Sequence, residues 1–389
     1  MMSGTSLDAI DVALVEFQRD PAQPTTAHAR ILHHGEQPWP EQVRRDLLAV
    51  LPPAGSDVGT WCRLHAQVGE AFAGAARAAL AERRADLVCT HGQTLYHWVE
   101  GPRARGSLQI GDASRIAAAT GVPVLHDVRA ADIAHGGHGA PLVPILDQLV
   151  FGDLPTAVVN IGGIANVSLV GQAEVIAGDI GPGNALLDAA VLHGTAGEQT
   201  CDLDGRLALA GRIDEELLDL LLAEAFYRLP LPRSTGREHF DAAYVQRTAR
   251  AAGRTSLPDL PDLAATLVEL TARTIAEALH ELGAQRVVLS GGGIHHPVLR
   301  RRLVELLAPT PVLAPESAGI PADAKEALLM ALLGWLGAEQ VPGVPARADG
   351  TAVTGASIPV VLGSLTPPVP LPASELTGLP VHRLRMTPP

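Results

Sequence analysis

Several kinds of residue are scarce in this chain of 389 residues. Lysine occurs once, as Lys325, and arginine supplies the other basic side chains. The net charge of −13 argues against the basic surface with which proteins bind nucleic acid or anionic membranes. A protein of this charge that binds a phosphorylated ligand must therefore use local donors, such as backbone N–H groups.

Cysteine is also rare, since only Cys62, Cys89 and Cys201 are present, far apart and without C-x-x-C spacing. This usage fits a reducing cytoplasm better than a disulfide framework. No signal segment begins the chain and no apolar run reaches the ~18 residues of a membrane span, so we expect a cytoplasmic protein with no membrane partner. With 47% hydrophobic and 18% charged residues, the composition is that of a globular protein rather than a disordered one.

Strand-like and helix-like segments alternate along the chain, which predicts an α/β fold. The expected strands are residues 10–17, 86–90, 156–161, 164–170 and 286–290, and the expected helices are residues 61–82, 263–282, 297–307 and 326–337. Residues 357–389 contain many prolines without periodicity, so we expect a loosely ordered tail there.

Four glycine-rich turns stand next to these strands: SGTSLD (3–8), NIGGIAN (160–166), GDIGPGN (178–184) and SGGGIHH (290–296). Glycine lets a backbone approach a ligand closely and direct N–H groups at an anion, although each turn alone could be purely structural. No turn fits the Walker pattern GxxxxGK[ST], and SGGGIHH departs from the dinucleotide pattern GxGxxG. Two glycine hairpins for phosphates and a late strand–GGG–helix turn for a nucleoside describe the actin-like ATPase plan.

Eight motifs make the comparison more specific: MSGTSLDAID, THGQTLYH, DVRAADIAHGGHGAPLVP, NIGGIANVS, DIGPGN, STGREHF, LSGGGIHHP and VTGA. In this order, from residue 2 to about residue 356, the chain closely resembles the anhydro-N-acetylmuramic acid kinase family. The resemblance implies two actin-like (RNase H-like) α/β domains with an ATP cleft between them. We expect domain I at residues 1–125 and 325–356 and domain II at residues 126–324.

The resemblance also implies an activity. Members of the family use ATP and water to open the 1,6-anhydro ring of anhydro-N-acetylmuramic acid and phosphorylate O6, giving N-acetylmuramic acid 6-phosphate in peptidoglycan recycling. The family behaves as a homodimer. Its members also carry a full strand ahead of the first turn, where this chain has two methionines. Either the translation start is misassigned, which we expect, or the edge of the first sheet is weakened.

Two alternatives to this activity are another actin-like sugar or acyl-phosphate kinase and an actin-like nucleotide switch. The switch would hydrolyse ATP slowly whether or not a sugar is present.

The turns supply the expected nucleotide-binding residues. The first phosphate turn would comprise Gly4, Thr5, Ser6, Leu7, Asp8, Ala9, Ile10 and Asp11. Gly162, Gly163 and Asn166 would form the second phosphate turn, and Gly291, Gly292 and Gly293 the nucleoside turn. Asp8 is the expected Mg²⁺ ligand, directly or through water, although Asp8 and Asp11 could also be ordinary acids at a strand edge. His295 and His296 replace a polar pair containing asparagine that is usual in the family.

Asp179 is the expected catalytic base, because a carboxylate in a glycine-rich turn can reach substrate and an aspartate with an ordinary pKa is ionised at neutral pH. The family has its catalytic aspartate in the same motif, and the alternative is an aspartate that only forms the turn. The resemblance places Gln93, Thr94, Arg129, His138 and Glu326 on the sugar side.

Two of these sugar-side residues have other plausible roles. Arg129 suits the lactyl carboxylate, but could instead form a surface ion pair with Asp127 or Asp132. Glu326 could simply favour its helix dipole. The His135–His138 pair lacks the cysteine partners usual for structural zinc, so both residues are expected to be polar loop residues.

Overall fold

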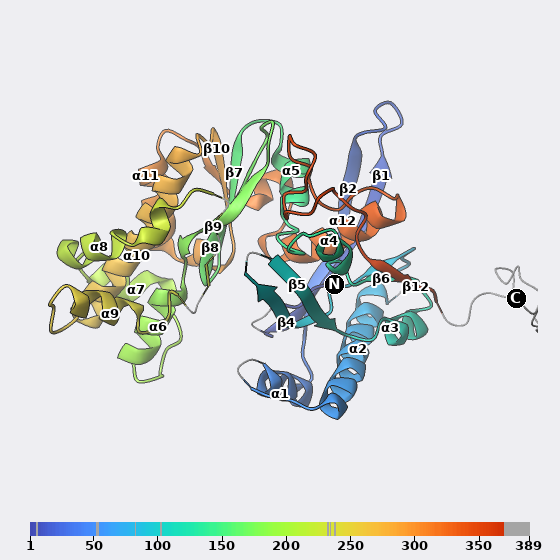
Figure 1. Ribbon diagram of the computed structural model, residues 1–389, viewed down its shortest axis with the longest axis horizontal. Coiled ribbons are helices and arrows are strands. Elements are labelled where there is room, and N and C mark those ends of the chain that lie inside the picture. The colour runs from blue at the N-terminus through green and yellow to red at the C-terminus, as the bar shows by residue number, and fades with distance from the viewer. Residues whose placement is uncertain are drawn as a thin grey trace, which may run out of the picture. The chain divides into compact units, whose positions relative to one another are not determined.

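The computed structural model describes residues 1–368 except Thr5, Ser6, Pro52, Pro53, Glu82, Pro102, Pro232, Ser234, Arg237 and Glu238. Contacts within the chain divide it into two compact units. Figure 1 shows the chain coloured by residue number. Unit 1 comprises residues 1–134, 326–342 and the chain from Val360 onward, and unit 2 comprises residues 135–325 and 343–359. Each unit combines helices with strands, so the predicted α/β class is confirmed.

The described strands of unit 1 form hairpins and a small mixed sheet. Strands β1 (Ala9–Arg19) and β2 (Ala27–Pro38) pair antiparallel, as do β4 (Gln93–Glu100) and β5 (Arg103–Ile110). Strand β6 (Val124–His126) lies between β3 (Val88–Cys89), to which it is parallel, and β12 (Ser364–Thr366), to which it is antiparallel. Before β1, Met2 forms a bridge with Asp11 and Ser3 forms one with Gln93.

The helices of unit 1 are α1 (Glu41–Val50), α2 (Val58–Leu80), α3 (Ala113–Thr120), α4 (Ala130–Ala134) and α12 (Lys325–Ala338), of which Lys325 itself belongs to unit 2. Helix α2 confirms the predicted amphipathic helix. Leu64, Val68 and Phe72, spaced four residues apart, are all buried in the core of the unit. The Asp57 side chain caps this helix by accepting the Thr60 N–H at 3.0 Å.

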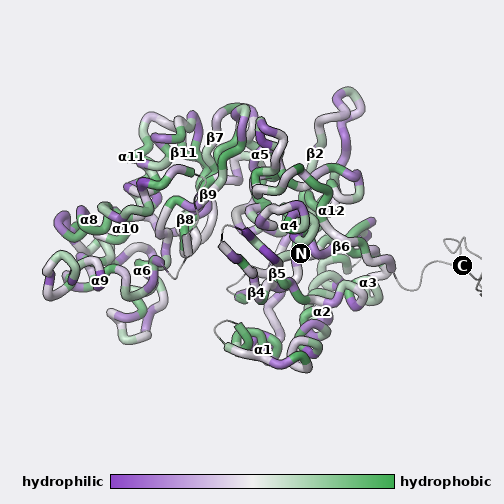
Figure 2. Tube along the Cα trace, viewed as in Figure 1, coloured by the Kyte–Doolittle hydropathy of each residue, from purple (hydrophilic) through white to green (hydrophobic). Residues whose placement is uncertain are grey.

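Unit 2 is built on a five-stranded sheet with the order β11–β10–β7–β8–β9. Strands β7 (Thr156–Ile161), β8 (Ile164–Val170) and β9 (Ile176–Pro182) are consecutive and antiparallel. Strand β10 (Arg286–Ser290) is parallel to β7, and β11 (Val312–Leu313) is parallel to β10. Three antiparallel strands extended by two parallel ones form the sheet of an RNase H-like domain. Strand β7 is predominantly hydrophobic (Figure 2), as a strand buried on both faces requires.

The helices of unit 2 are α5 (Pro144–Phe151), α6 (Ala185–Gly194), α7 (Arg206–Ala210), α8 (Glu215–Leu222), α9 (Tyr244–Ala251), α10 (Leu260–Glu281) and α11 (Pro297–Leu307). Short 3₁₀ segments occur at Leu203–Gly205, Ala225–Arg228, Gly292–His295, Pro315–Ala318 and Ala322–Ala324. Helix α10 is buried along much of its length and contacts α6, α7, α8, α11 and β9. It is therefore the central helix of the unit.

The two units differ in extent from the two predicted domains. Residues 126–134, predicted for domain II, lie in unit 1, where His126 pairs with Ser364 of β12 and Arg129 bonds to His91. Residues 343–356, predicted for domain I, lie in unit 2, where Thr354 O accepts the His138 N–H at 3.0 Å. These long-range pairings leave no local signal in the sequence.

The tail also differs in part from its prediction. Residues 364–366 were expected to be loosely ordered but form β12, because the hydrogen bonds of that strand are supplied by β6. Residues 357–363 and 367–368 are described without helix or strand, and residues 369–389 lie outside the described residues. Among the residues that the structure describes, no helix has both the length and the apolar composition needed to cross a bilayer.

Candidate functional site

Two of the predicted turns are bonded to each other in unit 2. Gly162 and Gly163 connect β7 to β8, and Gly163 O accepts the N–H groups of Gly183 and Ala185 at 2.9 and 3.1 Å. Gly162 O accepts the Asn184 N–H at 2.8 Å. A side chain at Gly183 would overlap the Gly162 carbonyl, so only glycine permits this close approach.

The predicted nucleoside turn packs against the same structure. Gly291 follows β10 with φ +84, and a Cβ there would lie 2.5 Å from Asn160 Oδ1. A Cβ at Gly293 would overlap the Ile161 side chain and approach Asn184 Oδ1 to 3.1 Å. The turns at residues 160–166, 178–184 and 290–296 therefore meet in one region of unit 2.

Asp179 lies in strand β9, opposite Asn166, whereas the sequence placed it in a turn. That expectation is corrected because residues 176–182 pair with β8 despite their glycines. The Asp179 side chain is half-buried, and its Oδ2 accepts the Thr235 N–H at 2.8 Å. Strand β9 thus presents a carboxylate beside Asn166, held by the loop that contains the STGREHF motif.

Arg233 fixes this loop and was missed by the sequence reasoning. Its guanidinium donates hydrogen bonds to the carbonyl oxygens of Asp179, Ile180, Phe226, Tyr227 and Leu229 at 2.6–3.1 Å. The Arg233 backbone O accepts the Asp179 N–H at 2.8 Å. Burial lowers the pKa of Arg233. The available signal was the arginine directly before the STG sequence.

The first phosphate turn lies in unit 1, and its Thr5 and Ser6 are outside the described residues. Leu7 and Ile10 are fully buried, so neither presents its side chain to a ligand. Ala9, Ile10 and Asp11 belong to strand β1 rather than to a turn, since β1 pairs with β2 from Ala9 onward. Asp8, just before β1, is exposed and accessible to a cation.

Gln93 connects this turn to the predicted sugar side. It begins strand β4, is fully buried, and donates from Nε2 to Gly4 O and to Thr94 O, both at 3.2 Å. Its Oε1 is buried with no hydrogen-bond partner among the described residues, and an unmade bond of this kind is costly. The hydroxyl of Thr94 accepts a hydrogen bond from Gln109 Nε2 at 3.2 Å.

Arg129 donates from Nε to Nε2 of His91 at 3.0 Å, an interaction that the sequence did not predict. Because Nε2 accepts, the proton of the neutral ring is on Nδ1, which lies 3.2 Å from Gly92 O. Burial and the neighbouring Arg129 lower the pKa of His91 to about 4, so the imidazole is neutral near pH 7. This hydrogen bond to His91 involves Nε of Arg129 and not its terminal nitrogens, Nη1 and Nη2. His91 stands in the THGQT motif, which was the available signal.

The remaining predicted sugar-side residues lie in different units. His138 lies in unit 2 and is tied through its backbone to Thr354, whereas Glu326 is exposed in the first turn of α12 in unit 1. Within the described chain, no group of three or more histidine, cysteine, aspartate or glutamate side chains is arranged to hold a metal ion.

His296 has a structural role. Its Nδ1 caps α11 by accepting the Leu299 N–H at 3.2 Å, and its Nε2 lies 3.2 Å from buried Asp202. These contacts, together with the preceding glycine turn, leave His296 oriented toward the body of unit 2.

The RNase H-like sheet of unit 2, with glycine turns crowded at β7, β9 and β10 and a carboxylate on β9, places the chain in the class of actin-like phosphotransferases. Within that class, the chain belongs to the anhydro-N-acetylmuramic acid kinase family, whose model matches residues 1–368.

Relatives named as members of this family are similar in sequence to nearly the whole of this chain. The anhydro-N-acetylmuramic acid kinase of Streptomyces coelicolor is 44% identical over 393 residues, covering 99% of this chain and 98% of the relative. That of Rhodococcus erythropolis is 43% identical, covering 94% and 93%, and that of Xanthomonas oryzae pv. oryzae is 40% identical, covering 94% and 96%.

Proposed function

We propose that this protein uses ATP to open the 1,6-anhydro ring of anhydro-N-acetylmuramic acid hydrolytically and to phosphorylate the sugar O6, yielding N-acetylmuramic acid 6-phosphate and ADP. The observation that carries the proposal is the arrangement in unit 2, where Asp179 on β9 stands opposite Asn166, beside the bonded turns Gly162–Gly163 and Gly183–Asn184. In a member of this kinase family, that arrangement supplies a base next to a phosphate-binding backbone.

Asp179 is assigned as the general base. A water molecule attacks the anomeric carbon while Asp179 accepts its proton, and the bond from that carbon to O6 breaks with its electron pair left on O6. The Thr235 N–H, 2.8 Å from Oδ2, orients the carboxylate. The proton later passes from Asp179 to solvent.

The freed O6 attacks the γ-phosphorus, and the bond from that phosphorus to the β,γ-bridging oxygen breaks, releasing ADP. Phosphoryl transfer depends mainly on positioning and charge neutralisation. We assign the backbone of Gly162 and Gly163 and the turn at Gly4 to the phosphates, and the turn at Gly291–Gly293 to the nucleoside. Mg²⁺ would neutralise phosphate charge, and the exposed carboxylate of Asp8 is an oxygen donor of the type that this ion prefers.

The sugar would be recognised by Arg129, Gln93, Thr94, His138 and Glu326. Arg129 is assigned to the lactyl carboxylate, because a guanidinium binds a carboxylate through two parallel hydrogen bonds. His91 orients Arg129 by accepting the hydrogen bond from Arg129 Nε at 3.0 Å. The role of His91 is therefore to position the Arg129 side chain. The buried, unpaired Oε1 of Gln93 suits a hydroxyl or amide donor on the ligand.

The deciding experiment measures ADP release with ATP and Mg²⁺, in the presence and absence of 1,6-anhydro-N-acetylmuramic acid. We expect sugar-dependent ADP release and one N-acetylmuramic acid 6-phosphate per ADP. Glucose and acetate are the matched alternative acceptors. Stimulation by either of them alone would indicate another actin-like kinase, and slow ADP release unaffected by any acceptor would indicate a nucleotide switch.

The same proposal includes the cellular location and the oligomeric state of the enzyme. A kinase that consumes ATP and returns a peptidoglycan fragment to metabolism belongs in the cytoplasm, and the family resemblance suggests a homodimer. Sedimentation of the purified protein tests the dimer directly.

A further inference from the structure

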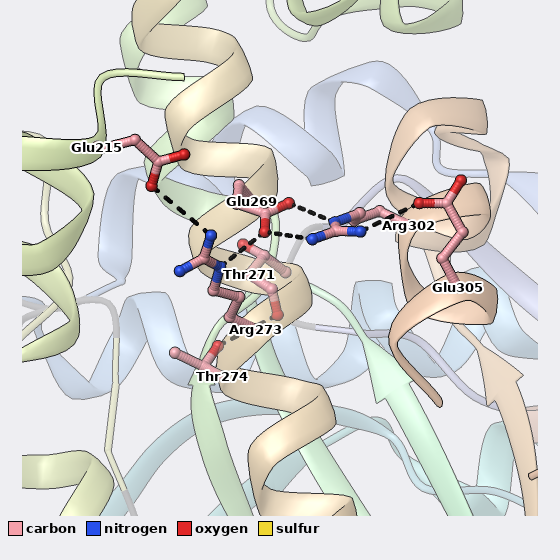
Figure 3. Close-up of polar contacts among 7 residues, drawn as sticks. All are labelled: Glu215, Glu269, Thr271, Arg273, Thr274, Arg302 and Glu305. Atoms are coloured by element: carbon pink, nitrogen blue, oxygen red, sulfur yellow. Dashed lines mark hydrogen bonds and ion pairs between the residues drawn. The ribbon is translucent and has the colours of Figure 1, made fainter. Parts of the chain in front are cut away.

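A buried carboxylate lies in unit 2 away from the residues assigned above. Glu269 of α10 is 3% exposed, and both of its oxygens accept hydrogen bonds from arginine side chains. Oε2 accepts from Arg302 Nε at 2.7 Å, and Oε1 accepts from Arg302 Nη2 at 3.0 Å and from Arg273 Nε at 2.7 Å. Figure 3 shows Glu269 between the two guanidinium groups.

This cluster connects three helices. Arg302 belongs to α11 and also donates to Glu305 at 3.1 Å, while Arg273 of α10 lies 3.6 Å from Glu215 of α8. The Arg302–Glu269 contact is bidentate, so it fixes the direction of α11 relative to α10 as well as its distance. Burial alone would raise the pKa of Glu269, but the hydrogen bonds from Arg302 and Arg273 lower it, so the carboxylate is charged.

Helix α10 also holds the strand that carries Asp179. Two residues after Glu269, the Thr271 hydroxyl donates to Gly183 O at 3.0 Å in a buried contact. Thr274 donates to Thr271 O at 3.1 Å, and its hydroxyl lies beside Gly181 of β9 (Figure 3 shows both threonines). One short stretch of α10 therefore contacts the assigned catalytic strand and, through Glu269, the helix that follows the nucleoside turn.

We propose that Glu269 is a positioning residue for nucleotide binding: by holding Arg302, it sets α11 and the preceding Gly291–Gly293 turn in register with the strand of Asp179. Only three residues, Ile294 to His296, separate this turn from α11, so a displacement of α11 would be transmitted to the turn. Gly291 and Gly293 pack tightly against Asn160, Ile161 and Asn184, so a small shift would disturb that packing. This inference rests on the proposed function for the assignment of that turn to the nucleoside.

The test is calorimetric titration of the full chain with ADP and Mg²⁺, without sugar. We expect the ADP Kd to rise about tenfold for Glu269→Gln, which keeps the shape but loses the charge-assisted bonds, and for Arg302→Lys, which keeps the charge but loses the fork. Arg302→Lys is the milder substitution, and its ADP titration tests the proposal if Glu269→Gln does not fold. Thr271→Val removes the hydrogen bond to Gly183 and should lower turnover with sugar.

The matched control is Arg254→Met, which removes a comparable ion pair of unit 2, between Arg254 and Asp214, that does not contact α11. We expect a lowered Tm with an ADP Kd within about twofold of wild type. The positioning role is overturned if Glu269→Gln and Arg302→Lys lower Tm in the same way yet bind ADP as wild type does. Failure of the wild type itself to bind ADP would instead contradict the proposed function.

Discussion

Asp179 allows the sharpest test at the scale of one residue. Asp179→Asn retains an oxygen that can accept the Thr235 N–H but cannot take a proton from water. We expect nearly normal ATP binding with a loss of turnover of about 10²-fold or more, since a positioned base contributes ~10²–10⁴ in rate. The measurement is steady-state ADP release together with a nucleotide titration.

Asp219→Asn, an exposed substitution on α8, is the control and should leave turnover unchanged. If Asp179→Asn keeps more than about a tenth of wild-type turnover, Asp179 is not the base. Asp8 would then be the next candidate.

His91 makes a separate prediction about pH. Its pKa of about 4 lies below the ordinary value of 6.5, so the unfolded chain binds a proton between these values that the folded protein does not. The contribution to stability is therefore complete above pH 6.5 and is lost as pH falls toward 4. When pH is lowered from 7 to 4.5, the unfolding free energy of the wild type should fall by about 2 kcal/mol more than that of His91→Gln.

Urea denaturation at both pH values measures this difference, with His34→Gln on exposed β2 as the control for removing an imidazole. Equal pH dependence in wild type and His91→Gln would show that His91 is not held neutral by its surroundings.

At the scale of elements, the packing of the glycine turns is the testable feature. Gly183→Ala would drive a Cβ into the backbone carbonyl of Gly162, which cannot rotate away, so β9 and the β7–β8 turn must separate. We expect a lower Tm and at least a tenfold loss of turnover. A tenfold loss corresponds to about 1.4 kcal/mol less transition-state stabilisation. Thermal melts and ADP release measure the two effects.

Gly74→Ala in the middle of α2 is the matched control, because a Cβ added there would meet nothing within 4 Å and alanine favours a helix. It should raise Tm slightly and leave turnover unchanged. If Gly183→Ala behaves like Gly74→Ala, the close contact between the turns is not required.

At the scale of the whole molecule, the residues assigned to ligands are distributed over both units. Gln93 and Arg129 belong to unit 1, whereas Asp179 and Gly291 belong to unit 2. Kinases commonly close around their substrates to exclude water from phosphoryl transfer. We expect the radius of gyration to decrease when a non-hydrolysable ATP analogue and the anhydro sugar bind together, as measured by small-angle scattering. An unchanged radius with both ligands bound would contradict closure.

Much of the fold was predictable because its signals are local. The predicted strand at 156–161 coincides with β7, because burial on both faces requires a continuous hydrophobic run. The predicted helix at 297–307 coincides with α11, whose buried leucines recur every four residues. Hairpin β4–β5 was missed, although Ala104, Leu108 and Ile110 alternate with polar residues along β5 in the pattern of a half-buried strand. Asp179 was identified as a candidate by its motif, but its position in a strand depends on pairing with β8.

By itself, the sequence determined which residues could serve a phosphotransferase: the glycines of the turns, Asp179, Arg129, and the order of motifs that places the chain in its family. Only the tertiary structure decided what surrounds them. Arg129 meets His91 across 38 positions, Asp179 meets Thr235 across 56, and Glu269 meets Arg302 across 33. Such pairs form because folding buries polar groups that must then find partners, and those partners are set by the packing of distant elements rather than by neighbours in the chain.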